Sequence, residues 1–269
     1  MVKAVHSWSL FRTMGRYVAP GSMPSGDLPE GGGGGLSLLE LPAELSGHGY
    51  RSVQLCHFYL PHTDPGYLDE VRAALDAAGV ELECFLVDDG DLTASAGADE
   101  QEAWLSGWLD VAEQLRAPRV RIPAGKQAPT PERLAESAAR LRRLAAGHRS
   151  VRVVTENWHA LLPDAAAVTT VLDAGEGEVG FLIDLGNWRG PDKYEQLARV
   201  AARAETCQAK CRIAENGELD LEDYRASLGV LRDAGYSGPL AMVYDGPDPD
   251  EWGHLEQAYA VVREVFPNA

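Results

Sequence analysis

The chain of 269 residues lacks the features that mark secreted and membrane-spanning proteins. Its four cysteines include no CxxC pair, and no N-terminal segment has the basic, apolar and cleavage-site pattern of a secretion signal. We therefore expect a reducing, cytoplasmic environment. No stretch approaches the roughly 18 to 20 consecutive apolar residues of a membrane span, so no membrane association is expected.

Basic residues are scarce, with 24 lysines and arginines against 41 aspartates and glutamates, a formal net charge of -17. Nucleic-acid binders gain affinity by neutralising phosphates, so nucleic acid is not an expected partner. A small anionic substrate is disfavoured only weakly, because one local Lys or Arg could still bind it. The expected partner is a small molecule, and a homo-oligomer remains open.

The remaining composition is that of a globular protein, with 45% hydrophobic and 24% charged residues. Short β-branched, apolar runs alternate with longer amphipathic stretches, which is the pattern of βα units. Eight strands are predicted, at residues 2–6, 52–57, 80–87, 119–122, 151–155, 179–183, 206–211 and 240–244. Helices are predicted at residues 65–78, 101–115, 131–146, 164–172, 193–204, 221–234 and 250–265.

Eight such units at this length predict a single (β/α)8 TIM barrel over residues 1–269. An open doubly wound sheet is the alternative, but it usually carries a Gly-rich fingerprint directly after its first strand. The run Gly31 to Gly35 lies too far along the chain for that. Residues 7–35 would instead form a long loop after the first strand, either a solvated insertion or a mobile lid.

Reactive groups of such barrels lie at the carboxyl ends of the strands. Glu156 follows the fifth strand and Asp184 follows the sixth. Two carboxylates directed at one volume repel each other unless a cation or a shared proton lies between them. A divalent metal would satisfy both, whereas a role in helix capping or in pairing with Arg is the structural alternative for each.

The seventh strand adds Gln208 and Lys210, which are two residues apart and so share one face. Lys210 could bind a substrate oxygen or neutralise an enolate, or it could simply extend into solvent. Cys207 and Cys211 share the other face, where we expect them to pack beneath helices.

Other polar residues near strand ends are candidate ligands for a substrate. Lys126 follows the fourth strand, where it could bind an anion or a hydroxyl group. His57, His62 and His159 follow strand ends and could be acids, bases or ligands, although a lone histidine is more often a hydrogen-bonded packing residue.

These strand-end residues resemble the xylose-isomerase-like barrels, a family that includes sugar phosphate isomerases, ketose 3-epimerases, hydroxypyruvate isomerase and inosose dehydratase. The resemblance spans nearly the whole chain and lies in four segments, Gly49 to Leu55, Thr155 to Trp158, Ile183 to Asn187 and Gly235 to Leu240. A subgroup with Asp88 to Asp91 after the third strand and Ala124 to Gln127 after the fourth is the most similar.

The resemblance implies a site in which Glu, Asp, His and Glu from strands five to eight hold a divalent cation. The first two fall on Glu156 and Asp184, but the His falls on Gln208 and the second Glu on Val243. Asp245 lies two residues beyond Val243 and could partly replace it. A metal (Mn, Mg, Co or Zn) is thus expected at Glu156, Asp184 and Gln208, weakened by these departures.

The implied activity is movement of a proton alpha to a carbonyl of a small polyhydroxylated substrate, as in an isomerase or epimerase. A dehydratase or lyase on the same site, and a non-catalytic small-molecule-binding protein, are the alternatives. The expected catalytic residues are Glu156, Lys210 and Asp245. Substrate contacts are expected from His57, Lys126, Asn187, Trp158, His159 and Tyr244.

Overall fold

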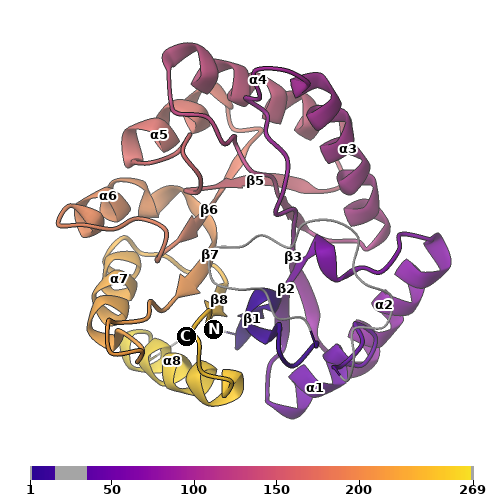
Figure 1. Ribbon diagram of the computed structural model, residues 1–269, viewed down its shortest axis with the longest axis vertical. Coiled ribbons are helices and arrows are strands. Elements are labelled where there is room, and N and C mark those ends of the chain that lie inside the picture. Colours follow the sequence, from indigo (N-terminus) through magenta and orange to yellow (C-terminus); the bar gives the residue numbers. More distant parts are fainter. Residues whose placement is uncertain (1, 16–34, 268–269) are drawn as a thin grey trace.

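The eight predicted strands form a closed parallel barrel in the computed structural model, which describes residues 2–15 and 35–267 (Figure 1). Each strand pairs with its neighbours in the sequence, and β1 closes the barrel against β8. The prediction of a TIM barrel is confirmed. The strands are β1 Ala4–His6, β2 Ser52–Cys56, β3 Glu81–Leu86, β4 Arg119–Arg121, β5 Arg152–Glu156, β6 Gly180–Asp184, β7 Ala204–Lys210 and β8 Leu240–Val243.

A ring of helices surrounds the barrel (Figure 1). All seven predicted helices are present, whereas α1 was not predicted. The ring consists of α1 Leu41–Gly47, α2 Pro65–Ala78, α3 Ala98–Gln114, α4 Pro131–Gly147, α5 Ala165–Ala174, α6 Lys193–Val200, α7 Leu221–Asp233 and α8 Glu251–Val265. Among the described residues, none of these helices combines the length and apolarity that crossing a bilayer requires.

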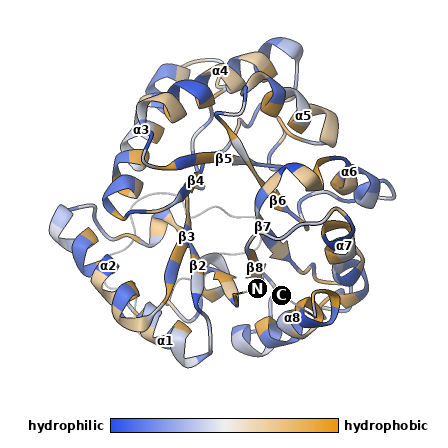
Figure 2. Cartoon of the chain, turned by 180° about the vertical axis from the view of Figure 1, so that it is seen from behind, coloured by the Kyte–Doolittle hydropathy of each residue, from blue (hydrophilic) through white to orange (hydrophobic). Residues whose placement is uncertain are grey.

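Local sequence signals explain where several helices begin and end. The Thr130 side chain accepts a hydrogen bond from the Arg133 backbone N–H and caps α4, whose first residue is Pro131. Gly79 ends α2 in a left-handed conformation with φ of 62°, which favours glycine. Hydropathy varies along every helix, and the strands are rich in hydrophobic residues (Figure 2). The core therefore lies between the barrel and the helix ring.

The barrel interior also contains a buried polar cluster. Gln54 Nε2 donates to Glu83 Oε2 at 2.7 Å and lies 3.0 Å from Thr206 Oγ1, which itself donates to Glu83. Arg119 Nη1 lies 3.0 Å from the other Glu83 oxygen. Because β2, β3, β4 and β7 all contribute, this cluster links strands across the barrel. Gln54 therefore helps to hold β2, β3 and β7 together inside the barrel.

The start of the loop after β1 is attached to α8. Residues Ser7–Leu10 form a short 3-10 helix, and the backbone N–H groups of Arg12 and Thr13 donate to the two oxygens of the buried Glu251 carboxylate. Residues 16–34 lie outside the described residues. The interpretation of residues 7–35 as a lid thus stays a prediction.

Truncation of a core residue tests this packing. Phe181 on β6 is fully buried, so we expect Phe181→Ala to lower the free energy of unfolding by about 3–5 kcal/mol. Tyr194→Ala is the control, because that ring is 39% exposed and its loss should cost about 1 kcal/mol or less. Urea unfolding measures both, and equal losses would contradict the burial described here.

Candidate active site

A cavity of about 340 Å³ opens at the carboxyl ends of the strands. The last residues of β1, β4, β5, β6, β7 and β8 all reach it, and so does Asp88, which lies after β3. Its polar lining comprises His6, Asp88, Arg121, Glu156, His159, Asp184, Asn187, Gln208, Lys210 and Asp245. Trp8, Trp158 and Val243 complete the wall. Seven of the eight strands thus contribute to one site.

Glu156 and Asp184 converge in this cavity and are bridged by Asn187. The Asn187 side chain donates from Nδ2 to Glu156 Oε1 at 2.7 Å, and its backbone N–H donates to Asp184 Oδ1 at 2.8 Å. Asn157 ties the ends of the two strands together by a pair of hydrogen bonds with the Asp184 backbone, of 2.7 and 2.9 Å. Both carboxylates are therefore held by the strand ends.

Arg121 is the central cation of the site, although the sequence analysis did not identify it. Its side chain is 1% exposed, and Nη1 donates to the Val87 carbonyl at 2.6 Å while Nη2 donates to Asp88. Its Nε lies 3.0 Å from Glu156 Oε2 as an ion pair, without hydrogen-bond geometry. The guanidinium thus lies between two carboxylates.

A second cation, Lys210, lies on the wall formed by β7 and β8. Its ammonium group pairs with Asp245 Oδ2 at 2.5 Å, and Asp245 lines the same cavity. Burial alone would lower the pKa of Lys210, but the charges of Asp245 and Asp184 outweigh it and raise that pKa. Lys210 is therefore charged at neutral pH.

The carboxylates of the site differ in their affinity for protons. Burial would raise the pKa of Asp88, but the Arg121 charge outweighs it and lowers that pKa. For Glu156, burial dominates over the Arg121 charge and raises the pKa. Burial also raises the pKa of Asp184, against Lys210 and two backbone N–H groups. Asp88 hence remains charged, while Glu156 can exchange a proton nearer neutral pH.

One side of the cavity is aromatic. The rings of Trp158 and His159 stack with 3.7 Å between their centroids, and the Arg121 guanidinium lies 4.9 Å from the Trp158 ring. His159 has φ of 58°, a left-handed conformation that is uncommon outside glycine. Burial lowers the pKa of His159 to about 4, so its ring is neutral near pH 7.

Three predicted substrate contacts do not line the cavity. His57 Nδ1 accepts from the Asp88 backbone N–H at 3.2 Å, beneath the site. Tyr244 donates to the Asp248 carbonyl and stacks on His254, because it alternates with Val243 along the chain and so points away. Lys126 pairs with Asp89 instead of facing the cavity. His62 likewise pairs with Asp64, at 2.9 Å.

The two motifs that follow β3 and β4 bind each other. Asp91 Oδ1 accepts from the backbone N–H groups of Thr93 and Lys126, and Oδ2 accepts from Gln127 Nε2 at 2.9 Å. This latch, formed by Asp91 with Thr93, Lys126 and Gln127, joins the two loops. Only Asp88 of the first motif reaches the cavity.

The residues missed by the sequence analysis carry a recognisable signal. Arg119 and Arg121 flank Val120, so both must face the interior if Val120 faces the helices. His6 ends the first strand and Asp88 lies two residues after the third, so both lie at the carboxyl ends of strands, as Glu156 does. The predicted packing of Cys207 and Cys211 is confirmed, since both are fully buried.

The donors in the cavity do not fit a divalent cation. Glu156 Oε1 accepts from Asn187 and Oε2 faces Arg121, while Asp184 Oδ1 accepts two backbone N–H groups. Gln208 offers a neutral amide and Val243 offers no ligand atom. A divalent ion would also face the charges of Arg121 and Lys210.

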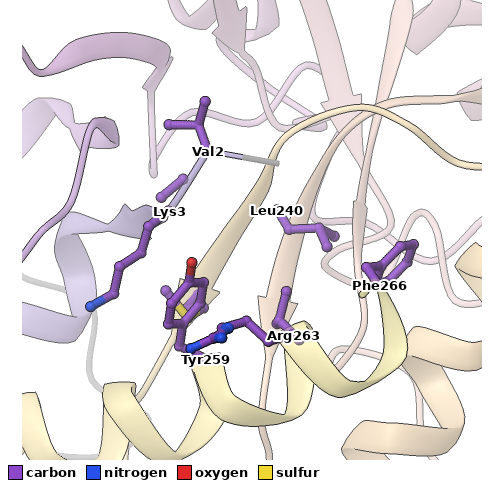
Figure 3. A pocket seen from close by; sticks show the side chains of 9 residues that line it. Val2, Lys3, Leu240, Tyr259, Arg263 and Phe266 are labelled. Atoms are coloured by element: carbon purple, nitrogen blue, oxygen red, sulfur yellow. The ribbon is translucent and has the colours of Figure 1, made fainter. Parts of the chain in front are cut away.

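Elsewhere in the described residues lie a cluster of possible metal ligands and a small hollow. Asp110, Glu113 and His148 bring ligand atoms within 4.8 Å of one another, but they lie on the outer helix α3 and directly after α4. A hollow between β1, β8 and α8, lined by Lys3, Tyr259 and Arg263 among others, measures about 20 Å³ (Figure 3). That volume holds about one water molecule, which is too small for a substrate.

Comparison with known proteins agrees with this architecture. The family described as xylose isomerase-like TIM barrel matches residues 42–264. The chain belongs to this family. A comparison of this chain with curated proteins found no match.

Solved structures of the same fold include three with different described properties. A Mycobacterium smegmatis xylose isomerase-like protein in complex with magnesium has 15% identity and a TM-score of 0.67, covering 98% of this chain and 97% of that one. The 3-keto-D-glucoside 4-epimerase of E. coli has 14% identity and a TM-score of 0.68, covering 98% and 99%. The probable 3-DHS dehydratase of Bacillus anthracis has 13% identity and a TM-score of 0.68, covering 97% and 98%. At these identities the likeness establishes the fold.

The buried His6 makes stability depend on pH. Burial lowers the pKa of His6 to about 3, so below pH 6.5 the unfolded chain takes up a proton that the folded protein does not. Stability is therefore lost as pH falls, by about 2 kcal/mol at pH 5 from this group. We expect His6→Asn to remove that part of the loss in urea unfolding at pH 7 and pH 5. The exposed His62→Asn is the control, and an unchanged pH dependence in His6→Asn would contradict the assignment.

Proposed function

We propose that this protein is a sugar isomerase or epimerase-like enzyme that moves a proton alpha to a carbonyl of a small, polyhydroxylated substrate. The observation that carries the proposal is the convergence of Glu156 with two cations, Arg121 and Lys210, around one cavity at the carboxyl ends of the strands. A base beside fixed positive charges is what the formation of an enolate requires. The related sugar epimerases with this fold support the same class of reaction.

Glu156 is the proposed base. Its carboxylate would remove the proton from the carbon next to the carbonyl, and the electrons of the C–H bond would move to the carbonyl oxygen. Arg121 and Lys210 would stabilise the negative charge that develops on this oxygen. Isomerisation follows when the former carbonyl oxygen takes the proton of the neighbouring hydroxyl group and Glu156 returns its proton to the former carbonyl carbon. Epimerisation follows when a second acid protonates the same alpha carbon from the opposite face.

The remaining lining favours an uncharged substrate rich in hydroxyl groups. In the described part of the cavity, carboxylates already balance the charges of both cations, which favours a neutral substrate over a phosphate dianion. The buried Gln208 Nε2 and His159 Nε2 have no hydrogen-bond partner and are available to hydroxyl groups. The faces of Trp8 and Trp158 provide apolar surface for a sugar ring.

Elimination of water is a second candidate reaction at the same site. It would share the proton abstraction by Glu156 and would need an acid to protonate a leaving hydroxyl group. The Lys210 ammonium group beside Asp245 is a suitable donor. Val243, where the family's second Glu is expected, favours instead a protein that binds a small molecule without reaction.

Replacing the proposed base gives a direct test. We expect wild-type protein in deuterated water to exchange the alpha proton of at least one neutral ketose in a panel that includes D-fructose, D-psicose and D-tagatose. Glu156→Gln should lower this exchange about 10²–10⁴-fold, because the amide cannot accept the proton. Proton NMR measures the loss of the C–H signal.

The matched control is Glu195→Gln on the exposed surface of α6, which should exchange at the wild-type rate. Water loss, detected as a new conjugated carbonyl absorbance, would identify the elimination reaction. Ligand binding by calorimetry without any exchange or elimination would contradict an enzymatic role, and an unchanged rate in Glu156→Gln would exclude Glu156 as the base.

A further inference from the structure

Arg121 lies among several carboxylates of the cavity and contacts more than one of them. Four carboxylates line the cavity, from Asp88, Glu156, Asp184 and Asp245. Arg121 contacts the first two of these, and Lys210 pairs with the last. The remaining carboxylate, of Asp184, accepts from the backbone N–H groups of Gly186 and Asn187, so every carboxylate of the cavity already has a positively polarised partner in the protein.

We infer that Arg121 takes the place of a divalent metal as the fixed positive charge of this site, so that the protein works without one. This inference rests on the proposed function, because the Arg121 charge would stabilise the enolate oxygen of that reaction. In a metal-dependent barrel, carboxylate oxygens are the ligands of the ion. Here, Glu156 Oε2 faces the Arg121 Nε at 3.0 Å instead.

The guanidinium is fixed at several points, as a substitute for a bound ion must be. Asp88 and the Val87 carbonyl accept from its two terminal nitrogens, and the Trp158 ring lies against it. These contacts come from the end of β3 and the loop after β5, on both sides of β4. An arginine is charged at every physiological pH, so this cation needs no loading from solution.

The other donor positions agree with the loss of a metal. Gln208 is 4% exposed, and its unpartnered Nε2 is an N–H donor beside the cavity, which suits a substrate oxygen and repels a cation. Val243 supplies no ligand atom. The two departures from the family pattern and the buried arginine are thus parts of one change, from a metal-binding lining to a hydrogen-bonding one.

Metal titration tests this without any substrate. The protein is treated with EDTA, dialysed, and titrated with Mn²⁺, Mg²⁺, Co²⁺ and Zn²⁺ to millimolar concentration. All variants carry His148→Gln, because His148 with Asp110 and Glu113 is a competing group at the outer helices. We expect the melting temperature of the protein with Arg121 to change by less than about 1 °C.

Removing the guanidinium should reverse this behaviour. Arg121→Met leaves the Asp88 and Glu156 carboxylates without their cation, so we expect a lower melting temperature without metal and a rise of several degrees with Mn²⁺. Arg121→Lys is the matched control, because it retains a positive charge and should remain insensitive to metal. If Arg121→Met does not fold, the titrations of the parent protein and of Arg121→Lys still decide.

Two results would overturn the inference. One is stabilisation of the parent protein by a metal, lost in Asp184→Asn. The other is an Arg121→Met protein that is as stable as the parent and equally insensitive to metal.

A separate measurement distinguishes this inference from the proposed function. Proton exchange by the parent protein is compared in EDTA and in Mn²⁺. If the titrations give the expected results but no exchange occurs in either solution, the proposed function is contradicted, whereas the inference that Arg121 replaces the metal still holds.

Discussion

The site depends on one buried interaction, the contact of the Arg121 guanidinium with carboxylates on both sides of β4. Asp88 is held in its charged form by this contact, and Glu156 is held beside it in a cavity where burial favours its protonated form. Removing one partner of such a group would leave an uncompensated buried charge, which is strongly destabilising. The arrangement of β3, β4 and β5 ends is therefore coupled to the electrostatics of the site.

The barrel supplies the geometry that such a contact needs. Parallel strands deliver their last residues to one end, so side chains far apart in the sequence meet there. Hydrogen bonds from Asn157 and Asn187 then fix the relative positions of the fifth and sixth strand ends. Below them, the buried Gln54, Glu83 and Arg119 cluster occupies the interior. The residues of the site are thus positioned by other polar residues that are themselves hydrogen-bonded.

The sequence predicted the barrel because alternation of apolar runs and amphipathic stretches is a local pattern, present in each unit separately. It also predicted that Glu156 and Asp184 lie near one another, since strand ends converge, and it left open whether Lys210 and Asp245 reach the same cavity. The sequence could not predict which side chains contact one another at the strand ends. Whether Lys126 faces the cavity or binds Asp89, and whether Glu156 meets an arginine or an open space, depends on side chains from other strands. The short helix α1 escaped prediction because it is only 7 residues long.

The latch between the loops after β3 and β4 restricts where substrate preference can change. Asp91 uses both carboxylate oxygens to bind the neighbouring loop, so that side of the opening is closed by contacts within the protein. Variation in those loops would first have to break the latch. The loops after β1 and β8 are joined in the same way, because Arg12 donates to the Gly246 and Pro247 carbonyls, so substitutions there would also have to preserve contacts within the protein.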